Sequence, residues 1–295
     1  MVVVTSTPRA TGDGFLLVGF DGSPDAAHAI TVAAHLLPGR PVRVAHIWTS
    51  LDPGSVLYRR LAHRASTREH LERLARHEAA AAADGVVAHG VALARAAGWT
   101  AEPVVRGEHT DEGVDLAALA AELRPRAVVV GSRGLGGVRG LLGSVSEVVA
   151  HRSSVPVLVV PPLLADERAA ATSGPAVVGH DGTAAAAHAH AVAAGLFAPR
   201  AVVPVHVEGP MGEGDADGVP PDAPRLRADG FGPAAVAEAI AREAAARRAG
   251  VIVVGSRQRS LLREVVLGSH ARAVLHDGHR PVLVVPPEPE GDDDP

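Results

Sequence analysis

A glycine-rich segment is the part of the sequence best suited to hold a ligand. It reads Gly131-Ser-Arg-Gly134-Leu-Gly-Gly-Val-Arg-Gly-Leu-Leu-Gly143-Ser144 and joins an apolar run to a segment with helical composition. Glycines allow the backbone to approach a ligand closely, and the N–H groups at a helix start attract anions. We therefore expect a phosphate-binding loop, with a plain glycine-rich turn as the alternative.

Polar side chains near two expected helix starts could assist such a loop. Asp21 follows an apolar run, and an acid at a strand end can accept hydrogen bonds from a ribose or a base edge. An Asp-Gly turn with Ser23 as N-cap and Pro24 at the first helical position explains these residues equally well. Ser144 and Glu147 form the S-x-x-E pattern of a capping box, although the Ser144 hydroxyl could also receive a phosphate.

The chain contains two copies of one sequence pattern. Equivalent segments occupy residues 15–21 and 176–181, 128–133 and 252–257, and 156–162 and 281–287. The offset between equivalent positions falls from 160 to 125 along the chain, so the second copy lacks about 35 residues. We predict copy one over residues 15–162 and a shortened, degenerate copy two over residues 176–287.

Apolar strands alternate with helices in copy one, which predicts a parallel sheet covered on both faces. We expect two tandem doubly wound, five-stranded, parallel-sheet domains with a Rossmann-like α/β fold, the second lacking one helix. The missing piece corresponds to residues 56–98, which read as a long helix interrupted near Asp84-Gly85. Residues 208–224 have a loop-like composition instead, and residues 163–174 form a short linker. Such sheets bind ligands beyond the carboxyl ends of their strands.

Composition excludes several classes of function. The net charge of -5 and the aromatic content of 2% argue against nucleic-acid binding. The absence of Cys excludes thiol chemistry, and the absence of Lys excludes a Walker A loop. No stretch reaches the ~18 apolar residues of a membrane span, and no signal peptide is recognisable. We expect a cytoplasmic protein with no nucleic-acid or membrane partner.

Three histidines repeat every seven residues, at His63, His70 and His77. Seven residues span ~10.5 Å along a helix, so no two of these side chains could reach one ion. We expect no metal site there.

These residues and their order resemble the universal stress protein family in its tandem form. ATP-binding members carry G-x2-G-x9-G-S/T after the fourth strand, an Asp after the first strand and a small aliphatic residue ending the second. The resemblance implies an adenine-nucleotide site in copy one, for ATP with or without magnesium. The implied residues are Asp21, Ile47, Val130, Gly131, Gly134, Gly143, Ser144, Val145 and Ser146.

Both copies depart from the family pattern. Copy one has eight residues between Gly134 and Gly143 instead of nine. Copy two keeps nine, but it has Gln258 in place of the second glycine and Ala271 in place of Ser146. Because a side chain at position 258 fills space that the motif keeps empty, we expect copy two not to bind ATP in the family manner.

Three functions fit these patterns. The first is a nucleotide-sensing stress-response protein, not an enzyme or at most a slow ATPase, because no general base is identifiable beside the loop. Its nucleotide would bias the intramolecular pairing of the two domains, or a homodimer. The second is a nucleotide-free scaffold that acts through protein–protein contacts and pairs its last strands across the copies. The third is an enzyme of the related nucleotide-hydrolase architecture, but neither an SGGxDS loop nor an H-x-G-H motif occurs.

Overall fold

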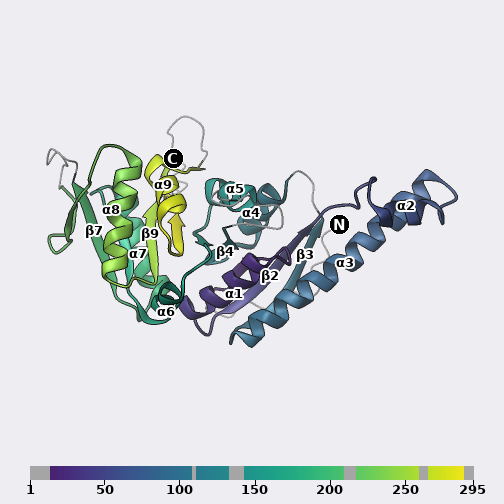
Figure 1. The fold of residues 1–295 in the computed structure, drawn as a ribbon, viewed down its shortest axis with the longest axis horizontal. Helices are drawn as coiled ribbons and strands as arrows, with labels where there is room; N and C mark the ends of the chain where they lie inside the picture. Colours follow the sequence, from purple (N-terminus) through teal and green to yellow (C-terminus); the bar gives the residue numbers. More distant parts are fainter. Residues whose placement is uncertain (1–13, 108–110, 133–142, 209–216, 259–264, 289–295) are drawn as a thin grey trace, which may run out of the picture.

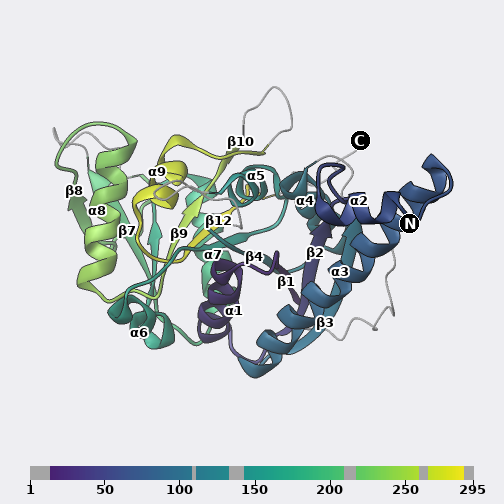
Figure 2. The ribbon, with the colours of Figure 1, turned by 45° about the vertical axis from the view of Figure 1, so that its right-hand side comes forward.

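One long sheet runs through the protein and is covered by helices on both faces (Figures 1 and 2). A computed structural model describes residues 14–107, 111–132, 143–208, 217–258 and 265–288. The strand order of the ten-stranded sheet is β3-β2-β1-β4-β5-β12-β9-β6-β7-β8. Gly134, one of the predicted site residues, lies outside the described residues.

Copy one forms the half of the sheet with the order β3-β2-β1-β4-β5, and all its strand pairs are parallel. Its strands are β1 (Leu16–Gly19), β2 (Pro41–Trp48), β3 (Thr100–Gly107), β4 (Ala127–Gly131) and β5 (Val157–Val160). Its helices are α1 (Pro24–Leu36), α2 (Val56–Ala62), α3 (Arg68–Ala96), α4 (Glu112–Leu123) and α5 (Ser144–Arg152).

Copy two forms the other half, in the equivalent order β8-β7-β6-β9-β12. Its strands are β6 (Ala176–Gly179), β7 (Val202–Glu208), β8 (Arg225–Arg227), β9 (Val251–Gly255) and β12 (Val282–Val285), and its helices are α7 (Ala184–Phe197), α8 (Pro233–Ala246) and α9 (Ser269–Asp277). A two-stranded antiparallel ribbon, β10 (Arg257–Gln258) with β11 (Val265–Val266), flanks the segment between β9 and α9. The predicted α/β class with two five-stranded, doubly wound halves is confirmed.

The halves meet through their last strands, β5 and β12, which pair antiparallel. Leu158 lies opposite Leu283, and these two residues occupy equivalent positions, 125 apart. The centre of this strand pair is therefore an approximate twofold axis that relates the copies. The pair joins two parallel half-sheets into one continuous sheet.

Small aliphatic side chains fill the two layers between the sheet and its helices. On one face, Leu16 and Val18 of β1 belong to a core shared with α1, α3 and α7. On the other face, Leu17 belongs to a core shared with α4, α5, α8 and α9. Alternate residues of one strand point to opposite faces, which explains why the strands read as unbroken apolar runs.

Copy one differs from copy two mainly by its long helix α3. This helix runs unbroken from Arg68 to Ala96, so the interruption expected near Asp84-Gly85 is wrong. Gly85 lowers the helix propensity of this segment without breaking the helix. Packing does not require a glycine there, because a Cβ atom at this position would meet nothing within 4 Å. The real break precedes α3, where α2 ends at Ala62. The described residues between β7 and β8, 217–224, contain no helix or strand.

The linker between the copies is a helix, α6 (Ala165–Ser173). Arg200 donates hydrogen bonds to the carbonyls of Ala171, Thr172 and Gly174, at the end of this helix, and to the carbonyl of His35 in copy one. The equivalent residue of copy one, Arg40, donates one to the carbonyl of Leu196 in copy two, at 3.3 Å. The two arginines thus reach across the twofold axis in opposite directions.

Candidate functional site

The predicted site residues gather at the carboxyl ends of β2, β1 and β4. Asp21 follows β1, Ile47 lies near the end of β2, and Val130 and Gly131 end β4. The strand order 3-2-1-4-5 changes direction between β1 and β4, and open α/β sheets bind ligands at such a point. Ile47 and Val130 are buried, with 7% and 4% of their surfaces exposed, so they shape the floor of this region.

The segment after β1 is a tight turn that positions the Asp21 carboxylate. Gly22 has a φ of 84°, a left-handed conformation that favours glycine. The Ser23 backbone N–H donates to Asp21 Oδ1 at 2.9 Å, and the Ser23 hydroxyl accepts from the Ala26 N–H at 3.1 Å. The N-cap predicted at Ser23 is confirmed. The turn holds the carboxylate half-exposed at the strand end.

A partly buried histidine of β2, His46, supports this turn. Its Nδ1 lies 2.9 Å from the Phe20 carbonyl oxygen, so the neutral ring donates a hydrogen bond from Nδ1. Burial lowers the pKa of His46, and the Phe20 carbonyl and Asp21 oppose that effect. The sequence contained a signal for this role, because His46 and His206 occupy equivalent positions in the two copies.

Gly131 allows β4 to approach the start of α1. A Cβ atom at this position would lie 3.0 Å from the carbonyl carbon and oxygen of Asp25. At the equivalent Gly255 in copy two, it would lie 2.9 Å from the carbonyl oxygen of Ala185. Packing thus requires both glycines whether or not a ligand is bound.

Backbone and hydroxyl hydrogen bonds join the two ends of the glycine loop. The Gly143 N–H donates to the Ser132 carbonyl at 2.6 Å. The Ser146 hydroxyl lies 3.1 Å from the same carbonyl oxygen and 2.9 Å from that of Gly143. Ser146 is 2% exposed, so its side chain fixes the loop ends from inside the fold. Residues 133–142 of the loop lie outside the described residues.

Helix α5 begins directly at the end of this loop. Its N-cap is Gly143, which has no side chain to cap the first turn, and the exposed Ser144 is the first helical residue. The capping box predicted for Ser144 and Glu147 is therefore wrong: Ser144 is one position past the cap. Glu147 instead forms an ion pair with Arg272 of α9, with 2.8 Å between Oε1 and Nη2.

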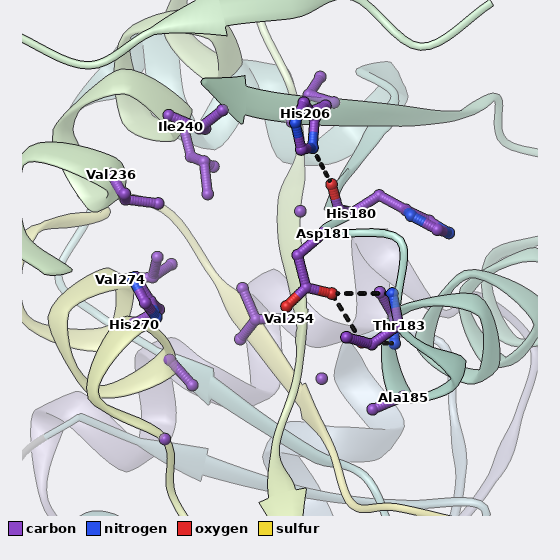
Figure 3. A pocket seen from close by; sticks show the side chains of 17 residues that line it. His180, Asp181, Thr183, Ala185, His206, Val236, Ile240, Val254, His270 and Val274 are labelled. Atoms are coloured by element: carbon purple, nitrogen blue, oxygen red, sulfur yellow. Dashed lines mark hydrogen bonds between the residues drawn. The ribbon is translucent and has the colours of Figure 1, made fainter. Parts of the chain in front are cut away.

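Copy two has a cavity of about 180 Å³ at the same place in its own half-sheet (Figure 3). It lies at the carboxyl ends of β6, β7 and β9 and is bounded by α7, α8 and α9. In Figure 3, Asp181 lies near the centre, His206 is at the top, and His270 and Val274 are on the side away from Thr183. Sequence reasoning missed this cavity because it followed the glycine motif, which copy two lacks.

The polar framework of this cavity repeats that of copy one. Gly182 has a φ of 83°, and Asp181 Oδ1 accepts from the N–H and the hydroxyl of Thr183, at 3.3 and 2.6 Å. His206 Nδ1 lies 2.9 Å from the His180 carbonyl oxygen, as His46 does from that of Phe20. The turn and its supporting histidine therefore belong to both copies.

Two features are absent from the residues that the structure describes. None of their helices is long and apolar enough to cross a membrane. Among the same residues, no three His, Asp or Glu side chains come together in a way that could hold a metal ion.

Comparisons with known proteins agree with the repeated architecture. The profile of the Universal stress protein family matches residues 16–161 and 233–286. A universal stress protein of Mycolicibacterium smegmatis is 31% identical over 302 residues, covering 92% of this chain and 97% of that protein. The crystal structure of a universal stress protein from Archaeoglobus fulgidus superposes with a TM-score of 0.63 at 20% identity, covering 96% of this chain and 98% of the other. A protein from Pseudomonas aeruginosa UCBPP-PA14 gives 0.57 at 14% identity, with 94% of each chain covered. The chain therefore belongs to the universal stress protein family.

Proposed function

We propose that copy one binds an adenine nucleotide, ATP with or without magnesium, and that the protein is a nucleotide-sensing, non-catalytic stress-response protein of the cytoplasm. The observation that carries this proposal is the closure of the glycine loop. A backbone hydrogen bond joins Ser132 to Gly143, the residue before α5 begins, so the loop must return to the helix N-terminus, where N–H groups attract phosphate.

The described residues of copy one suit the parts of such a ligand. Asp21 presents a half-exposed carboxylate that can accept hydrogen bonds from ribose hydroxyls. Ile47 and Val130 form an apolar floor, and the exposed Ser144 hydroxyl lies at the start of α5. None of these described side chains is placed as a general base for water, which favours binding over turnover.

Thermal unfolding with and without millimolar MgATP tests the proposal. A ligand at 100 times its Kd stabilises the folded state by about 2.7 kcal/mol, so the melting temperature rises. Gly143→Trp should abolish the rise, because it places a ring at the start of α5. Position 143 has a φ of -67°, which accepts any side chain. Gly268→Trp, the equivalent change in copy two with a φ of -62°, is the matched control and should keep the rise.

Two outcomes would contradict the proposal. If MgATP gives no rise at any concentration, the nucleotide site is absent. If labelled ATP is converted to product over many turnovers, the protein is an enzyme.

A nucleotide-free scaffold is the second candidate. The antiparallel pairing of β5 with β12 favours it, because this pairing builds a two-copy platform from backbone hydrogen bonds without any ligand. The eight-residue spacing between Gly134 and Gly143 also favours it. An unchanged melting temperature with MgATP would support this candidate.

A further inference from the structure

The cavity in copy two differs in character from a phosphate site. Val236, Ile240, Val254 and Val274 provide much of its wall. No arginine is among its lining residues as far as the chain is described, and the chain contains no lysine. Burial lowers the pKa of His180 at its edge, assisted by His190 and opposed by Asp181. Apart from histidines, the only ionisable side chain that lines the cavity in the described part of the chain is the Asp181 carboxylate, so neither arginine nor lysine is there to balance a phosphate.

The polar groups of the cavity favour hydrogen-bond donors on the ligand. Asp181 is a carboxylate and can only accept. His206 donates from Nδ1 to the His180 carbonyl, and in the tautomer protonated at Nδ1 alone its Nε2 is an acceptor. His206 is 5% exposed, and its Nε2 has no hydrogen-bond partner within the described part of the chain. A buried acceptor without a partner destabilises the folded protein, and a hydrogen-bond donor on a ligand would satisfy it.

The α8 wall has lost an acidic residue relative to copy one. Leu116 of α4 and Ile240 of α8 are equivalent, because each lies against the glycine that ends the first strand of its copy, Gly19 or Gly179. Four residues earlier, copy one has Glu112 and copy two has Val236, which lines the cavity. The change makes the second site more apolar.

The size of the cavity limits the ligand. An apolar cavity of ~150 Å³ holds one benzene ring, and the cavity in copy two measures about 180 Å³. A triphosphate would also need a glycine loop, and copy two has Gln258 in the second glycine position. One ring with a few donor groups therefore fits the space and the chemistry.

We propose that copy two binds an uncharged ring compound that carries N–H or O–H donors and no phosphate. A free nucleobase, a pentose and a nucleoside share this chemistry. Donor groups of the ring would bond the Asp181 carboxylate and His206 Nε2, and its apolar faces would contact Val254 and Ile240. The two copies would then bind different ligands at equivalent places in one sheet.

Calorimetric titration of the full chain with adenosine, adenine, ribose and ATP tests this proposal. At least one phosphate-free probe should bind, and comparison of adenine, ribose and adenosine shows whether the base, the sugar or both are recognised. Phosphate-free binding should persist in Gly143→Trp and should be lost when Gly268→Trp is added to that variant, because Gly268 lines the cavity. Asp181→Asn keeps an acceptor for the Thr183 N–H but removes the charge, and should weaken binding about tenfold.

The failure of this proposal is distinct from a failure of ATP binding in copy one. If no phosphate-free probe binds, or if binding survives Gly268→Trp and disappears in Gly143→Trp, copy two holds no such ligand. ATP binding that survives Gly143→Trp but not Gly268→Trp would equally overturn it. If Gly268→Trp fails to fold by circular dichroism, Asp181→Asn decides, and unchanged affinity in that variant rejects the proposal. An absence of ATP binding alone affects only copy one.

Discussion

Copy one and copy two share a scaffold and differ around their candidate binding sites. Both have a left-handed glycine after an Asp, a histidine that holds the preceding carbonyl, and a glycine where the fourth strand meets the first helix. They differ in α3, in the wall residue at Glu112 or Val236, and in the glycine loop. Packing requires the features that the copies share. Only the features that differ can therefore give the two copies different binding preferences.

The strongest test of this division concerns the shared glycines at the ends of β4 and β9. Gly131→Ala and Gly255→Ala should each destabilise the protein by about 1–3 kcal/mol, because the added Cβ overlaps the first turn of α1 or α7. Urea unfolding measures the loss. Gly143→Ala is the control and should cost far less, since its φ of -67° suits alanine. A small cost at Gly131 with a large cost at Gly255 would show that the copies do not share this packing.

The two arginines that reach across the twofold axis should have unequal effects. Arg200→Ala should cost about 2 kcal/mol, because Arg200 serves four carbonyls, three of them at the end of α6. Arg40→Ala removes the 3.3 Å hydrogen bond to the Leu196 carbonyl and should lower the free energy of unfolding by less than about 1 kcal/mol. Urea unfolding of the two variants under identical conditions gives the ranking. If both variants lose the same free energy of unfolding, Arg200 of copy two is not the main residue that holds α6 in place.

A smaller effect is expected at the ion pair between Glu147 and Arg272. The two residues occupy equivalent positions, 125 apart, and carry opposite charges. Both are partly exposed, so Glu147→Arg should cost at most about 1 kcal/mol at low salt. The double variant Glu147→Arg with Arg272→Glu should recover most of that loss. Urea unfolding of the original protein, the two single variants and the double variant gives a thermodynamic cycle. If the losses of the two single variants simply add in the double variant, the ion pair does not contribute to stability.

The smallest effect concerns acid stability through His46. Its pKa in the folded state lies below the unfolded value of 6.5, mainly because it is buried. Below pH 6.5 the unfolded chain therefore binds the proton more readily, and the free energy of unfolding falls as the pH is lowered towards the folded pKa. His46→Asn keeps a donor near the Nδ1 position and cannot titrate, so its melting temperature should fall less steeply between pH 6.5 and 5. A parallel fall in both proteins would contradict this role.

Much of the fold could be predicted from the sequence, because apolar strands, repeated segments and turn residues are local signals. The five-stranded halves, the N-cap at Ser23 and the missing long helix of copy two followed from them. The short strand β8 carried no such signal, since two of the three residues of Arg225–Arg227 are arginines and the segment becomes a strand by pairing with β7. The predicted capping box was wrong by one position. Gly143, whose N–H donates to the Ser132 carbonyl, is the N-cap instead of Ser144.

The site was harder to predict than the fold. The motif located Asp21 and the loop ends correctly on one edge of the sheet, but it could not show that Gly131 is needed for packing or that Ser146 faces the loop from inside. These facts depend on segments more than ten residues away. The cavity of copy two could not be predicted from the sequence, because its lining residues come from six elements and form no consecutive pattern.

The central pairing of β5 with β12 also fixes the stoichiometry of the protein. Both strands belong to one chain and are connected through α6, so their association is unimolecular, and dilution should not separate them. Every molecule thus carries one half of each kind in a constant ratio. A change confined to one half can always be measured against the intact second half in the same molecule.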